Sequence, residues 1–170
     1  MSIPNAILVI VLAVSLYTDL KQRKILNSIT LPAAAAGLLY NCAAGGLAGA
    51  KLSLGGLLAG FALLLIPFLM GGIGAGDVKL LAAVGAIKGP AFVINAGLCS
   101  ALAGGILALG LLLYRGMFLQ VLKNTAWGLV TLKGSFLTGG SMMGGAFPYG
   151  VAIFAGTLFT LFTGWSLWAF

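Results

Sequence analysis

Gly74-Ala75-Gly76-Asp77-Val78-Lys79 is a polar, glycine-rich stretch between two long apolar runs. It contains Asp77, one of only two acidic residues in the chain. The other is Asp19, and the sequence has neither glutamate nor histidine. Acid–base chemistry by carboxylate side chains would therefore depend on these two aspartates.

The composition is that of an integral membrane protein. Of the 170 residues, 61% are hydrophobic and 6% are charged, whereas a soluble domain carries roughly a quarter charged residues. The apolar runs approach the roughly 20 residues that a transmembrane helix needs, and the alternation of a barrel strand is absent. We therefore expect an all-α, polytopic membrane bundle that forms a single domain over residues 1–170. The net charge of +7 is explained better by membrane topology than by nucleic-acid binding, because the basic residues lie between apolar runs.

The apolar runs predict about six membrane spans. They lie near residues 3–18, 25–44, 52–70, 78–87, 91–114 and 146–170. The four glycines within 71–76 disfavour a regular helix there. Residues 115–145 are mixed in character and are predicted to form a cytoplasmic interfacial segment.

The basic residues orient these spans. Seven of them fall on one side of the membrane: Lys21, Arg23, Lys24, Lys79, Arg115, Lys123 and Lys133. Only Lys51 and Lys88 fall on the other side. The positive-inside rule makes the first side cytoplasmic and leaves both termini outside. Asp19 and Asp77 then reach the same cytoplasmic face.

Two aspartates at one membrane depth predict a catalytic dyad. Ionisable groups in a membrane are costly and usually functional. Two close carboxyl groups share a proton, because both cannot ionise comfortably. One carboxylate could then take a proton from water while the other donates to a peptide carbonyl. Each residue also has an ordinary explanation. Asp19 could pair with Arg23, and Asp77 could pair with Lys79 or cap a helix.

Smaller features predict packing. Gly56-x-x-x-Gly60 and Gly85-x-x-x-Gly89 would let helices approach closely. Cys42 and Cys99 are expected to be small buried hydrophobes, and the sequence leaves a disulfide between them open. We expect no metal site and no cofactor, because no cluster of metal-ligating residues is present.

Three blocks of the sequence resemble the type IV prepilin peptidase family. The first is the Gly-x-Gly-Asp-x-Lys signature at Gly74–Lys79. The second runs from Asp19 through Arg23 to Asn27, where Leu26 replaces the proline usual in the family. The third is Phe147-Pro148-Tyr149-Gly150, which is similar to the Pro-Phe/Tyr-Gly motif that opens the last span.

The resemblance implies an intramembrane aspartic endopeptidase with Asp19 and Asp77 as its catalytic pair. Supporting or substrate-binding positions would be Gly74, Gly76, Lys79, Arg23, Asn27, Pro148, Tyr149 and Gly150. The chain resembles the short, peptidase-only form found with Flp (tight-adherence) pili, because it lacks the cysteine-bearing insert associated with N-methylation.

The implied substrate is a prepilin-like membrane protein, such as an Flp pilin or pseudopilin. Its basic leader would be removed at the cytoplasmic face of a prokaryotic inner membrane. The implied partners are the lipid bilayer and pilus or secretion machinery, with no nucleic acid.

Two other functions are compatible with a membrane protein of this composition. A small proton-coupled transporter or channel could use Asp19 and Asp77 as a relay. Both acids are expected at one face, however, whereas a relay would spread across the membrane. A structural membrane subunit would leave the isolated acids and the glycine-rich stretch unexplained.

Overall fold

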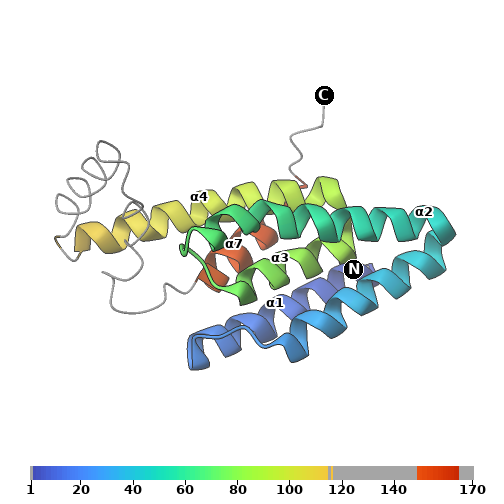
Figure 1. Ribbon diagram of the computed structural model, residues 1–170, viewed down its shortest axis with the longest axis horizontal. Helices are drawn as coiled ribbons and strands as arrows, with labels where there is room; N and C mark the ends of the chain where they lie inside the picture. Colours follow the sequence, from blue (N-terminus) through green and yellow to red (C-terminus); the bar gives the residue numbers. More distant parts are fainter. Residues whose placement is uncertain (1, 115, 117–148, 165–170) are drawn as a thin grey trace.

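The structure is a computed structural model that describes residues 2–114, 116 and 149–164, and all secondary structure in this part of the chain is helical (Figure 1). The helices are α1 (Ile3–Gln22), α2 (Asn27–Leu69), α3 (Ala75–Lys88), α4 (Pro90–Tyr114) and α7 (Tyr149–Thr163). The interfacial segment predicted at 115–145 lies, except for Gly116, outside the described residues.

Helix α2 is two helical arms joined by a reversal at Gly46. This residue has φ 55° and ψ −133°, which side-chain-bearing residues rarely adopt. The arms at 27–45 and 47–69 double back on each other in Figure 1. The predicted break between the spans near 25–44 and 52–70 is confirmed, but helix resumes directly after Gly46 instead of near residue 52.

In the described part of the chain, three helices are long and apolar enough to cross a membrane: α1, α2 and α4 up to Leu111. Helix α7 is a shorter apolar helix. Their outer faces expose many large apolar side chains, which include Ile10, Leu39, Leu58 and Ile106. Such a surface suits lipid rather than water, so the protein is a membrane protein.

Helix α3 lies at the centre of the bundle. It packs mainly against α2, while α4 packs mainly against α7 (Figure 1). Its side chains from Val78 to Ile87, with the exception of Lys79, are all buried. They join Leu8 and Leu12 of α1 and Ile153 of α7 in one apolar core.

The close helix approach predicted for the glycine-spaced pairs is confirmed where Gly56 meets Gly85. A methyl group placed on Gly85 would overlap the carbonyl oxygen of Gly56, and one placed on Gly56 would overlap that of Gly85. Backbones this close leave room only for the hydrogen atom of a glycine. The packing of the second arm of α2 against α3 therefore depends on both glycines.

Polar groups also fasten α2 to the C-terminal end of α3. The Asn41 side-chain amide donates to the carbonyl oxygens of Ala86 and Ile87, at 3.0 and 3.2 Å. Ser53 Oγ donates to the same Ala86 oxygen at 2.7 Å. The last carbonyls of a helix lack intrahelical donors, and these side chains supply them.

Cys42 and Cys99 are both free thiols, so they do not form the disulfide that the sequence left open.

Candidate active site

Asp19 lies in the last turn of α1. The helix ends at Gln22, and Arg23 adopts a left-handed conformation with φ 52° and ψ 35°. The Arg23 amide donates to the Asp19 carbonyl oxygen at 2.8 Å, which closes the end of the helix. The chain then runs from residue 23 to 26 without helix and enters α2 at Asn27. Asp19 is 7% exposed.

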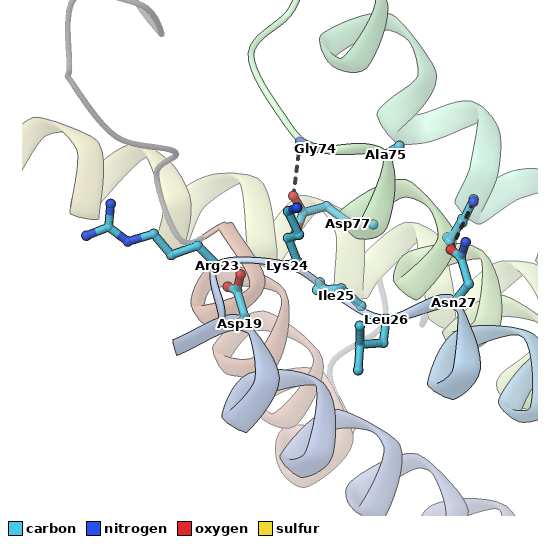
Figure 2. Close-up of a pocket in the computed structure, with 11 residues that line it drawn as sticks. Asp19, Arg23, Lys24, Ile25, Leu26, Asn27, Gly74, Ala75 and Asp77 are labelled. Carbon is cyan, nitrogen blue, oxygen red and sulfur yellow. Dashed lines mark hydrogen bonds between the residues drawn. The ribbon is translucent and has the colours of Figure 1, made fainter. Parts of the chain in front are cut away.

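Asp77 lies in the first turn of α3. Its Oδ2 accepts a hydrogen bond from the Gly74 amide at 3.1 Å (Figure 2), so the predicted capping role is confirmed. The residue is 8% exposed. The helix begins at Ala75, so the glycine-rich break is confined to residues before it, and Gly76 and Asp77 are helical, contrary to our expectation.

One pocket of about 410 Å³ brings the two aspartates together (Figure 2). Five predicted supporting residues line it with them: Arg23, Asn27, Gly74, Gly76 and Lys79. Two segments that are far apart in the sequence, residues 19–27 and 74–79, therefore form one site.

Gly76 allows this approach. A methyl group on Gly76 would lie 2.9 Å from Ile25 Cβ and 3.2 Å from the Ile25 carbonyl oxygen. Any larger residue would push α3 away from the connection between α1 and α2. A glycine at position 76 therefore provides the space in which α3 approaches this connection.

Helix α7 closes the site from another side. A methyl group on Gly150 would lie 2.5 Å from Asp19 Oδ2, so the Asp19 carboxyl rests directly against the Gly150 backbone. The Gly150 amide interacts with this carboxyl electrostatically, and the neighbouring Tyr149 ring is within electrostatic reach of Asp77. The predicted supporting residue Pro148 lies outside the described residues.

The charged neighbours do not neutralise the aspartates. Within the described part of the chain, neither carboxyl forms an ion pair, and Asp19 Oδ2 has no hydrogen-bond partner. The Arg23 side chain extends away from both carboxyl groups in Figure 2. Lys79 Nζ instead donates to Asn27 Oδ1 at 3.0 Å, which links α3 to the start of α2.

Asp77 precedes the predicted fourth span and lies outside the helices long enough to cross a membrane. Burial raises the pKa of its carboxyl from 3.8 to about 6. The Gly74 amide opposes this change by stabilising the ionised form, and the Asp19 charge raises the pKa further. Burial is the largest of these effects, and the Asp19 charge is the smallest.

Comparison with known proteins identifies the family. Residues 6–109 match the model of the type IV leader peptidase family. The chain belongs to the type IV leader peptidase family. The match covers 61% of the chain, from α1 into α4, and includes both aspartates. No curated protein and no solved structure matches the chain significantly.

Four further residues line the pocket of this peptidase, and sequence reasoning did not select them: Lys24, Ile25, Leu26 and Ala75. Three belong to the connection between α1 and α2. Their position follows from the path of the backbone, which residue type alone does not reveal. The sequence block from Asp19 to Asn27 could have indicated the three residues of this connection, because residues between Arg23 and Asn27 must lie near the same pocket.

The peptidase thus holds two buried carboxyl groups in a partly open pocket, with an unsatisfied oxygen on Asp19. This arrangement can accept a water molecule and pass protons between water and a bound amide. Among the described residues no group of three or more metal-ligating side chains occurs.

Proposed function

We propose that the protein is an intramembrane aspartic endopeptidase, and that Asp19 and Asp77 are its catalytic pair. The observation that carries this proposal is the shared pocket. The only two acidic side chains of the sequence come from separate helices, are both buried and influence each other's ionisation. A peptidase of this family needs groups that activate water, and these are the acids available.

The proposed reaction uses one proton held between the two carboxyl groups. In this proposal Asp77 holds the proton in the resting pair and donates it to the oxygen of the scissile carbonyl. Ionised Asp19 takes a proton from water, whose oxygen bonds to the carbonyl carbon. When the tetrahedral intermediate collapses, the C–N bond breaks and Asp19 returns its proton to the leaving amine. Asp77 recovers a proton from the intermediate's hydroxyl group.

The proposed substrate is a prepilin-like precursor, such as an Flp pilin or pseudopilin, cleaved without N-methylation. The site lies where helices end, and the pocket is partly open. A substrate could therefore keep its basic leader in water and its apolar helix in lipid. Our proposal places the site at the cytoplasmic face of a prokaryotic inner membrane. Six spans would comprise α1, both arms of α2, the fourth span within α3, α4 and α7.

Cleavage of a prepilin-like peptide by the purified protein in detergent tests the proposal. Asp19→Asn and Asp77→Asn should each fold and each lose cleavage by at least about 10³-fold, as expected when a general acid–base group is removed. Ser28→Ala, at an exposed position beside the pocket, is the matched control and should cleave normally.

Two results would contradict the proposal. One is an unchanged rate in either aspartate variant, which would exclude the dyad mechanism. The other is wild-type protein that cleaves nothing yet supports proton flux in proteoliposomes, which would favour the relay.

A further inference from the structure

A second pocket, of about 290 Å³, lies at the other end of the bundle. It forms where α1 and α4 begin and where α3 and α7 end. Its polar lining is contributed by Asn5, Lys88, Asn95 and Thr160. Along α3, Lys88 is eleven residues beyond Asp77, which corresponds to roughly 16 Å. This pocket is therefore separate from the candidate active site.

The sequence contains no acidic side chain that could neutralise Lys88 here. Its Nζ donates to Asn5 Oδ1 at 2.8 Å and lies 5.1 Å from the centroid of the Phe92 ring. Neither partner carries a negative charge. The only two acidic side chains of the sequence both line the pocket at the opposite end. A partly buried ammonium group without a counter-charge is costly, so an external anion would stabilise it.

The start of α4 adds a second positive feature. The helix begins at Pro90, and Ala91 and Phe92 of its first turn line the pocket. The first amides of a helix lack intrahelical acceptors and carry the positive end of the helix dipole. Pro90 has no N–H, and the Val93 amide donates to the Gly89 carbonyl oxygen at 3.2 Å, so the amides that α4 offers a ligand are those of Ala91 and Phe92. Lys88 and this helix end therefore face the same cavity, an arrangement that favours anions.

The remaining walls are suited to an anion with an apolar attachment. Asn95 and Thr160 are polar and nearly fully buried, at 2% and 3% exposed. Phe92 and Leu161 provide apolar surface beside them. After the bond to Asn5, the ammonium group retains two further N–H donors.

We propose that this pocket binds a phosphate group, carried by an anionic phospholipid or free in solution. The ligand's oxygens accept hydrogen bonds from Lys88 and from the amides of Ala91 and Phe92. The site is independent of the proposed protease chemistry. Its occupancy would hold α1, α3, α4 and α7 together at the end remote from the aspartates.

Thermal unfolding in detergent tests the proposal. The purified protein is titrated with dihexanoyl phosphatidylglycerol, with dihexanoyl phosphatidylcholine, or with inorganic phosphate against equal chloride. We expect a saturable rise in Tm with phosphatidylglycerol that exceeds the effect of phosphatidylcholine. Saturation by inorganic phosphate as well would identify the phosphate group alone as sufficient, whereas saturation by phosphatidylglycerol alone would identify a lipid site.

Matched variants localise the effect. Lys88→Gln should weaken the apparent affinity at least about tenfold, since a charge-assisted bond is lost. Lys51→Gln removes the same charge from an exposed position nearby and should leave the affinity unchanged. Lys88→Arg should retain binding.

Absence of a saturable shift in the wild type, or equal affinity in Lys88→Gln, would overturn the proposal. If Lys88→Gln does not fold, Asn5→Ala decides the question, because it removes the hydrogen bond that holds Lys88 Nζ in the pocket. Weakened binding in Asn5→Ala would support the site, and unchanged binding would overturn it.

Discussion

At the scale of single residues, the two aspartates could be identified because the sequence contains no other acidic residue. The ends of the helices determine which side chains lie beside them. The alternative in which Asp19 pairs with Arg23 assumed that both lie on one helix. Arg23 instead lies beyond the helix end in a left-handed conformation, where i, i+4 neighbours no longer meet. Asp77 and Lys79 are two positions apart on α3 and face different directions, so Lys79 reaches Asn27 instead.

The contact between Gly150 and Asp19 predicts a specific loss of activity. Gly150→Ala would place a methyl group against Asp19 Oδ2 and move the carboxyl from its position. Displacement of a catalytic group by about 1 Å can cost roughly 10²-fold in rate. We therefore expect cleavage of a prepilin-like peptide to fall by about that factor while Tm changes little.

Two other glycines provide the controls. Gly105 of α4 has no atoms within 4 Å of its added methyl position, so Gly105→Ala should leave the rate unchanged and should not lower Tm. Gly156 of α7 packs against Ser100, away from the pocket, so Gly156→Ala should lower Tm. Wild-type cleavage in Gly150→Ala would show that the observed place of Asp19 is not required.

At the scale of elements, the sequence predicted where helices would be broken better than where they would begin. The break before α3 was expected to extend to Asp77, since four glycines disfavour helix. The helix begins at Ala75 because the Asp77 carboxylate caps Gly74 and because α3 is buried on nearly all sides. Tertiary packing offsets the cost of about 1 kcal/mol for a helical glycine at Gly76.

The backbone contact between α2 and α3 predicts a large difference between adjacent glycines. Gly56→Ala would overlap the Gly85 carbonyl and force the helices apart, which should lower the free energy of unfolding by about 2 kcal/mol. Gly55→Ala meets only Pro90 Cγ, at 4.0 Å, and should be neutral or stabilising by up to about 1 kcal/mol. Unfolding by denaturant in detergent measures both.

A double variant tests whether one contact causes the effect. Gly85→Ala should cost about as much as Gly56→Ala. The combination should cost less than the sum, because the helices separate only once. Equal losses in Gly55→Ala and Gly56→Ala would show that close approach is not what stabilises this pair.

At the scale of the whole molecule, hydropathy predicted a helical membrane bundle, and the gaps between apolar runs predicted that Asp19 and Asp77 share one end. The shared pocket confirms that they lie together. The bundle's interior arrangement could not be predicted in the same way. Hydropathy does not show which helix is surrounded by the others. Helix α3 is buried among helices, whereas the outer side chains of α4 face lipid, and this difference comes from packing.

The orientation of the bundle remains a prediction that thiol labelling can test. In a variant without Cys42 and Cys99, Ser28→Cys reports on the end that holds the aspartates, and Gly45→Cys reports on the reversal of α2. Both positions are exposed. Because Lys21, Arg23, Lys24 and Lys79 lie at the first end, a membrane-impermeant maleimide should label Gly45→Cys in intact spheroplasts and Ser28→Cys only after permeabilisation. The reverse pattern would place the aspartates outside, away from a cytoplasmic leader. Labelling of both in intact spheroplasts would mean that the first arm of α2 does not cross the membrane.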